Sequence, residues 1–330
     1  MKRFFVCMLC VLMLLSMIGC AKTELPDNTT QAPKATESPE EAKVLKIFTI
    51  GNSHSNYATQ LLYEVFKAQN PEQEVVIGTM YYSGCSIAKH VNFALKDEPV
   101  YEYNLNYNGT WERIKDMSLK MGLRAQAWDI VVLQEAGDGN EDNFKNTNRQ
   151  LLVDFVNENL PHPHQFVWNM DIVSPNDETF YSPGYDPQPP AGFKEKMQKQ
   201  YNGDPVTALR MSQQNMVNYI LPDPTYTNYI PTGTAILYAH LVDGWKQTDL
   251  YRDYTHASDY GRLIAAYMWY AQLTGEPLTE VKVDTIEASL RHRRAIQLGD
   301  MEVTAEMKQT IINAVNYSLE HPLEVPGESK

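Results

Sequence analysis

Short apolar runs alternate with segments whose apolar residues recur at helical spacing. Residues 44–50 form the first such run, which Gly51 ends, and a helical pattern follows through Leu61, Leu62, Val65 and Phe66. Further strands are predicted at 74–79, 130–133, 165–170 and 228–230, and helices at 87–95, 151–160, 193–220 and 258–273, the last ended by Gly275. This alternation predicts an α/β fold with a parallel sheet covered by helices on both faces.

Two stretches interrupt the alternation. Residues 100–113 are rich in Tyr and Trp, and residues 174–192 are rich in Pro, Gly and Tyr. Both are predicted to be long insertions, which commonly form the walls of binding clefts. Residues 276–330 are expected to be a C-terminal helical extension packed on the domain. Its function does not show in the sequence.

The N-terminus has the pattern of a targeting segment. Lys2 and Arg3 precede an almost wholly apolar stretch, 4–18, and Met17-Ile18-Gly19-Cys20 follows. This resembles a bacterial lipoprotein signal with its lipobox. The resemblance implies a signal peptide at 1–19, lipidation of Cys20, and an extracytoplasmic lipoprotein held on the bacterial cell membrane through its N-terminal lipid. A simple secretory signal or a retained anchor is the alternative. Residues 20–43 lack the apolar content to fold and are predicted to be a flexible tether.

Composition excludes several classes of protein. The 330 residues are 43% hydrophobic and 21% charged, which are values of a globular chain. The formal net charge of −13 argues against nucleic acid as a partner, because an acidic surface repels phosphates. Past the N-terminus the longest helical apolar stretch, 263–273, is shorter than the roughly 20 residues that span a bilayer. With Cys7 and Cys10 in the signal and Cys20 lipidated, only Cys85 remains, so no disulfide within the mature chain is expected.

Four groups of polar residues follow the predicted strands or lie near the C-terminus: Gly51-Asn52-Ser53-His54, Gly84-Cys85-Ser86, Gln134-Glu135 and Asp253-Tyr254-Thr255-His256. Ligands of open parallel sheets bind at the carboxyl ends of the strands. Together the groups supply a hydroxyl, amide donors, an imidazole and a carboxylate. Each also has a simpler interpretation: Ser53 as a helix cap, Asp253 and His256 as caps of the following helix, and Gln134 as a partner of a buried backbone group.

These groups resemble the sequence blocks of the SGNH (GDSL-like) hydrolase superfamily, in particular a branch whose first block reads Gly-Asn-Ser. The resemblance covers about 45–275, so the hydrolase-like domain is placed at 44–275. It implies Ser53 as nucleophile, His256 as base and Asp253 as acid, with an oxyanion hole formed by Ser53, Gly84 and Gln134. The third block departs from the usual Gly-x-Asn-Asp, since Leu133-Gln134-Glu135 stands there. The implied fold is a flavodoxin-like three-layer α/β/α sandwich.

The chemistry of these residue types agrees with the resemblance. A serine at a strand-to-helix turn lies near helix-terminal N–H groups that favour a developing anion. His256 can accept its proton, and Asp253 can hold the other ring nitrogen. Oxyanion donors are each worth about 10²–10³ in rate. Glycine at position 84 is expected because a side chain there would obstruct the approach of the backbone.

Other chemistry is not indicated. Cys85 has no matched base and is expected to be a small buried thiol. His54 is expected to border the pocket without acting. His162 and His164 lack the spacing of a metal site, and no Gly-rich phosphate loop follows a strand, so neither a metal nor a nucleotide cofactor is expected.

The sequence therefore predicts a surface-anchored serine esterase that removes acyl groups, acetyl foremost, from a carbohydrate through an acyl-serine intermediate. The expected partners are an acylated carbohydrate or another ester, and the membrane through the lipid. One alternative is a lipase or lysophospholipase of the same superfamily. The other is a noncatalytic glycan-binding lipoprotein that keeps the scaffold.

Overall fold

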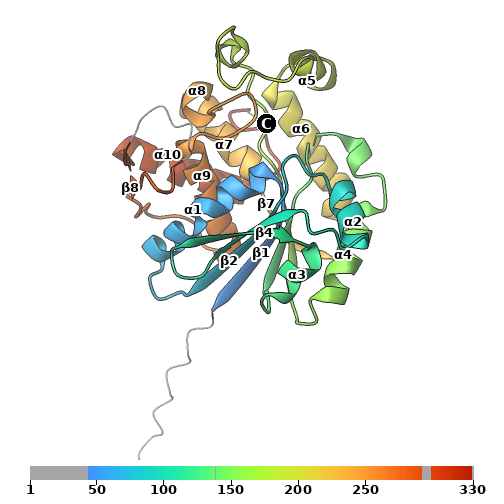
Figure 1. The fold of residues 1–330 in the computed structure, drawn as a ribbon. Coiled ribbons are helices and arrows are strands. Elements are labelled where there is room, and N and C mark those ends of the chain that lie inside the picture. The colour runs from blue at the N-terminus through green and yellow to red at the C-terminus, as the bar shows by residue number, and fades with distance from the viewer. Residues whose placement is uncertain (1–43, 138, 292–298, 329–330) are drawn as a thin grey trace, which may run out of the picture. The chain divides into compact units, whose positions relative to one another are not determined.

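A central sheet of seven strands lies between two layers of helices (Figure 1). The computed structural model describes residues 44–137, 139–291 and 299–328. The predicted signal peptide, Cys20 and the tether lie outside these residues. The strands are β1 (Leu45–Gly51), β2 (Val75–Tyr81), β3 (Tyr101–Asn106), β4 (Trp111–Met117), β5 (Ile130–Leu133), β6 (Gln165–Asn169) and β7 (Tyr226–Ile230).

The strand order is β4-β3-β2-β1-β5-β6-β7. Strands β2, β1, β5, β6 and β7 are mutually parallel. Numbered among themselves they run 2-1-3-4-5, which is the doubly wound order of flavodoxin-like folds. The predicted α/β fold with a parallel sheet is thereby confirmed. Strands β1 and β5 are almost completely buried, as expected of strands covered on both faces.

The helices form one layer on each face of the sheet. They are α1 (Ser53–Gln69), α2 (Ile87–Leu95), α3 (Leu119–Arg124), α4 (Asn148–Asn159), α5 (Phe193–Tyr201), α6 (Pro205–Asn215), α7 (Thr232–Leu241), α8 (Gln247–Leu250), α9 (Asp259–Thr274) and α10 (Ala305–Glu320). Helices α1, α7, α9 and α10 contribute to the apolar core on one face, whereas α2, α3, α4 and α6 contribute to the core on the other (Figure 1). The molecule is the three-layer sandwich that the sequence resemblance implied.

The prediction for 100–113 was wrong. These residues form β3 and the start of β4, which extend the sheet as an antiparallel pair beyond β2. Tyr101 and Tyr103 are each 1% exposed and belong to the core, while most of β4 is exposed at the edge of the sheet. The hairpin was mistaken for an insertion because an outer strand has no continuous apolar run.

The helical segment predicted at 193–220 is divided. Helix α5 ends where Asn202 adopts a positive φ of 53°, and α6 begins anew at Pro205. The side chain of Asp204 caps α6 by accepting the N–H groups of Val206 and Thr207. A π-helical turn, Met216–Ile220, continues α6. The break lets α5 run separately from α6 (Figure 1).

The C-terminal part contains more than helices. Strands β8 (Thr285–Ile286) and β9 (Met301–Glu302) pair antiparallel, and α10 packs against α7 and α9. Helix α9 ends at Gly275, as predicted.

Within the described ranges no helix combines the length and the apolar character that a membrane crossing requires.

Candidate active site

Ser53 is the first residue of α1, at the carboxyl end of β1. The N-cap is Asn52, whose side-chain oxygen accepts the N–H of His54 at 2.9 Å. Because Asn52 performs the capping, the hydroxyl of Ser53 remains available. The turn is tight, since a Cβ at position 51 would collide with the side chain of Ser55. The first N–H groups of the helix have no partner within the helix and favour an anion at this point.

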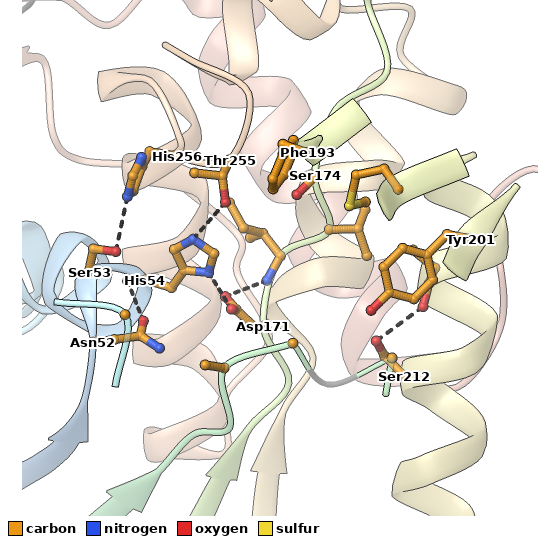
Figure 2. Close-up of a pocket in the computed structure, with 18 of the residues that line it drawn as sticks. Asn52, Ser53, His54, Asp171, Ser174, Phe193, Tyr201, Ser212, Thr255 and His256 are labelled. Carbon is orange, nitrogen blue, oxygen red and sulfur yellow. Dashed lines mark hydrogen bonds and ion pairs between the residues drawn. The ribbon is translucent and has the colours of Figure 1, made fainter. Parts of the chain in front are cut away.

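The structure brings Ser53, His256 and Asp253 together in one hydrogen-bonded array, and Figure 2 shows the contact between Ser53 and His256. The Nε2 atom of His256 lies 3.0 Å from the Oγ atom of Ser53. Its Nδ1 atom lies 2.9 Å and 3.0 Å from the two carboxylate oxygens of Asp253. The order of atoms is that of a serine nucleophile, its base and the group that orients the base.

The loop before α9 holds Asp253 and His256 in register. Tyr251 and Ala257 form a β-bridge at its base, and the Oδ1 atom of Asp253 accepts the N–H groups of Thr255 at 3.0 Å and His256 at 2.8 Å. Neither residue caps α9, because the hydroxyl of Ser258 accepts the N–H of Gly261 at 3.1 Å. The simpler interpretation of both residues as helix caps is therefore wrong.

Burial and hydrogen bonding set the charges of this pair. Burial acts to raise the pKa of Asp253, but the hydrogen bond and charge of His256 and the backbone N–H groups outweigh it and lower the pKa to about 2. Burial lowers the pKa of His256 below its usual value, against the opposing hydrogen bond to Asp253, and the nearby His54 lowers it further. The pair thus combines an ionised carboxylate with a neutral imidazole at neutral pH.

Of the three predicted oxyanion-hole residues, two line the pocket and the third, Gln134, does not. Ser53 and Gly84 both line the pocket. Gly84 has a φ of +58°, and a Cβ built there would meet no heavy atom within 4 Å. The positive φ is therefore the reason for glycine at this position. The expected reason, that a side chain here would obstruct the approach of the backbone, is wrong.

Gln134 lies beneath the pocket wall and is completely buried. Its Nε2 atom donates to the Oδ2 atom of Asp171 at 2.9 Å and approaches the Oδ1 atom of Asn52 at 3.4 Å. Its Oε1 atom accepts the hydroxyl of Ser55. Gln134 thus bonds to side chains, where the simpler interpretation had it satisfy a buried backbone group.

Asp171 is a site residue that the sequence analysis missed. It is 4% exposed, follows β6, and pairs with the Nδ1 atom of His54. The Nε2 atom of His54 lies 3.3 Å from the hydroxyl of Thr255 (Figure 2). The sequence carries a signal for it, because Asp171 stands just after the strand predicted at 165–170, and ligands of parallel sheets bind at the carboxyl ends of strands.

The pocket beside Ser53 has a volume of about 360 Å³. The loop 174–192 reaches it through Ser174, and α5 supplies Phe193, Lys196, Met197, Gln200 and Tyr201. No residue of 100–113 lines it, which corrects the expectation that this segment forms a wall. The floor therefore comes from the strand ends and the wall mainly from α5 and α6.

Cys85 is buried, and burial raises the pKa of its thiol to about 12. The thiolate that a nucleophile requires is therefore disfavoured. Among residues 44–137, 139–291 and 299–328, no group of three or more His, Cys, Asp or Glu side chains is placed to hold a metal ion.

The fold and the site define an α/β protein with a Ser–His–Asp array at the carboxyl ends of its parallel strands. Residues 46–295 match the model of a domain of unknown function, DUF4886, and the chain belongs to the DUF4886 family. The crystal structure of a DUF4886 protein from Bacteroides uniformis shares its fold, with 21% identity, a TM-score of 0.68, and coverage of 86% of this chain and 97% of that one.

Two further solved structures are more distant. Axe2, an acetyl xylan esterase from Geobacillus stearothermophilus, is 12% identical, with 71% of this chain and 96% of that one covered and a TM-score of 0.41. LAE5, an alpha/beta hydrolase from the metagenome of Lake Arreo, Spain, is 11% identical, with 71% and 98% covered and a TM-score of 0.39. No curated protein matches the chain.

Proposed function

We propose that this protein is a serine esterase that removes acyl groups, acetyl foremost, from a carbohydrate through an acyl-Ser53 intermediate. The observation that carries the proposal is the hydrogen-bonded array in which His256 lies 3.0 Å from the hydroxyl of Ser53 and 2.9 Å from Asp253. A neutral imidazole with its Nδ1 atom held by an ionised carboxylate is a competent general base at neutral pH.

The reaction proceeds in two halves. The proton of the Ser53 hydroxyl passes to the Nε2 atom of His256 as Oγ bonds to the acyl carbon. The carbon–oxygen bond to the alcohol then breaks, and the alcohol takes that proton. Water repeats the attack on the acyl-enzyme and releases the acid. The N–H groups of Ser53 and Gly84, at the floor of the pocket, are the proposed donors to the oxyanion.

The pocket has a mixed lining. Polar side chains, Ser83, Ser174, Lys196 and Gln200, suit a polar alcohol, whereas Ile172, Val173 and Met197 offer apolar surface to an acyl group. Phe193 and Tyr201 add aromatic surface that suits a sugar ring. These features support a carbohydrate as the alcohol of the ester, and the volume of about 360 Å³ supports a short acyl group over a long one.

The test is hydrolysis of p-nitrophenyl acetate and of longer p-nitrophenyl esters by the detergent-solubilised full chain, with Ser53→Ala beside it. We expect the acetate to be the best substrate and the variant to lose activity by about 10⁴-fold or more. Ser289→Ala, at an exposed serine away from the pocket, is the matched control and keeps the wild-type rate.

The other outcomes separate the alternatives. Activity that rises with acyl length in the wild-type protein indicates a lipase or lysophospholipase. Retained activity in Ser53→Ala overturns the assignment of the nucleophile. Binding to acetylated polysaccharide without turnover of any ester supports a noncatalytic glycan-binding protein.

The proposed site of action is the outer side of the bacterial cell membrane, reached through a lipid on Cys20. The support is the sequence of residues 1–20, with its positive start, apolar stretch and Gly19-Cys20 pair. We expect Cys20→Ser to move the protein from the membrane fraction to the soluble fraction and to abolish labelling by a radioactive fatty acid. Cys85→Ser is the matched control. Fatty-acid labelling that persists in Cys20→Ser would contradict the lipid site.

A further inference from the structure

Two hydrogen-bonded networks connect the same two segments of the chain. Ser53 and His54 are neighbours at the start of α1, and Thr255 and His256 are neighbours in the loop before α9. The first network joins Ser53 to His256 and Asp253. The second joins Thr255 to His54 and Asp171, so each segment gives one hydroxyl and one imidazole (Figure 2). The catalytic array does not use the second network.

The second imidazole is also paired with a buried carboxylate. The Oδ1 atom of Asp171 accepts the N–H of Ile172 at 2.7 Å, and its Oδ2 atom accepts the amide of Gln134 at 2.9 Å. A carboxylate with these donors accepts a further proton donor, so the Nδ1 atom of His54 carries hydrogen. The Nε2 atom then accepts the hydroxyl of Thr255, and the oxygen of that hydroxyl keeps acceptor lone pairs for the pocket, which both residues line.

The chemistry of this pair fits a hydroxyl group. The Nε2 atom of His54 accepts a hydrogen bond when the ring is neutral and donates one when it is charged, and the hydroxyl of Thr255 does both. An alcohol hydroxyl complements the pair in either state. A carboxylate would lie close to two buried anions, Asp171 and Asp253, which are 4% and 2% exposed. A neutral ligand is therefore favoured.

The position places such a hydroxyl beside the leaving group. The leaving oxygen takes its proton from the Nε2 atom of His256 and therefore lies within about 3 Å of it. The rings of His54 and His256 stand edge to face with their centres 5.5 Å apart. A hydroxyl on the carbon next to the ester carbon of the alcohol is thus within reach of His54. The side chain of His54 is 17% exposed, which leaves it open to this contact.

We propose that His54 and Thr255 bind a free hydroxyl of the substrate next to the ester, so that the enzyme selects monoacylated diols and polyols such as sugars. The inference rests on the proposed esterase function and names its substrate class. Asp171 and Gln134 are positioning residues, since they orient His54 without contacting the substrate.

The experiment compares two esters of nearly equal shape, 2-hydroxyethyl acetate and propyl acetate, with the detergent-solubilised full chain. Acid release gives kcat/KM for each ester, and the ratio of the two values reports the hydroxyl. We expect the wild-type protein to prefer the hydroxylated ester about tenfold, the effect of one well-made hydrogen bond. Thr255→Val keeps the shape of the side chain and is expected to bring the ratio close to one.

A second variant and a control complete the test. His54→Gln is expected to lower the ratio as well, because its shorter amide cannot meet both Asp171 and the substrate. Thr285→Val, at an exposed threonine on β8, keeps the wild-type ratio. The ratio separates binding from damage, since a merely structural effect lowers kcat/KM for both esters alike.

The possible outcomes distinguish failure of this inference from failure of the esterase proposal. A wild-type ratio near one, with both esters hydrolysed, overturns this inference and leaves the esterase intact. A wild-type preference that persists in Thr255→Val and His54→Gln assigns the hydroxyl to other residues and also overturns it. Failure to hydrolyse either ester, with p-nitrophenyl acetate also untouched, overturns the esterase proposal and this inference with it.

Discussion

In the proposed esterase, the charge states of single side chains set the pH range of activity. His256 would serve as a base only while it is neutral, and burial lowers the pKa of its imidazole. Asp253, whose pKa is about 2, stays ionised throughout the range in which proteins are usually assayed. We therefore assign the expected fall of activity at low pH to protonation of His256.

We expect kcat/KM for p-nitrophenyl acetate to fall on acidification with a midpoint below 6.5, the ordinary value for histidine. The sign follows because a lowered pKa keeps the imidazole unprotonated to lower pH. The measurement is a pH profile from 4.5 to 8, with circular dichroism at each pH to show that the protein stays folded. A midpoint at or above 6.5 contradicts the assignment.

The sequence shows the proposed reacting residues better than the residues that orient them. Ser53, Gly84, Asp253 and His256 stand in short local blocks, and a spacing of three residues is enough to join the last two. The link from His54 to Asp171 spans 117 residues and depends on β1 and β6 sharing one end of the sheet. Gln134 is the clearest example of what the sequence does not show. Its position at the end of a strand can be predicted, but the direction of its side chain cannot.

Helix α9 fixes the loop that carries His256, and its N-cap is a measurable part of that support. The hydroxyl of Ser258 accepts the N–H of Gly261 and donates to the carbonyl of Asp249. We expect Ser258→Ala to lower the free energy of unfolding by about 1 kcal/mol, since an N–H of the first turn loses its partner. Urea unfolding measures the effect. Ser258→Thr keeps both bonds and is expected to retain most of the stability, so an equal loss in both variants contradicts the capping role.

The sequence predicted elements well where burial is uniform. Strand β5 and the apolar part of β1 are continuous apolar runs, and α9 has both helical spacing and a clear end at Gly275. Strand β4 is polar and exposed because it is the outer strand, and a sequence with four charged residues in five resembles a loop. Helix α5 was joined to α6 because periodicity alone does not reveal the turn at Asn202.

The stability of the whole molecule also depends on pH through Glu135. This side chain is 3% exposed and accepts the N–H groups of Ala136 at 2.7 Å and Ile87 at 3.3 Å. Burial raises the pKa of its carboxyl from 4.5 to about 7, against those hydrogen bonds. A raised pKa in the folded state gives stability that is full below pH 4.5 and is lost as the pH rises through 7.

We expect Glu135→Gln, which keeps the shape without the charge, to remove this dependence. From pH 4.5 to 7.5 the free energy of unfolding of the wild-type protein should fall relative to the variant by about 3 kcal/mol. Urea unfolding at the two pH values measures the difference. Glu195→Gln, on an exposed part of α5, should show no such change. A constant difference between wild type and Glu135→Gln contradicts the burial of an ionisable carboxyl.

The separation of 203 positions between Ser53 and His256 determines when the site can form. The proposed nucleophile stands early in the sequence, on the second element of the domain, whereas its proposed base and the carboxylate that orients it stand in the loop before α9. Until that loop has docked, the hydroxyl of Ser53 lacks its hydrogen bond to His256. If Ser53 is the nucleophile of an esterase, as proposed, a chain that is interrupted before Asp253 lacks both the base and the group that orients it, so the activity is expected only in molecules that contain this loop and have folded.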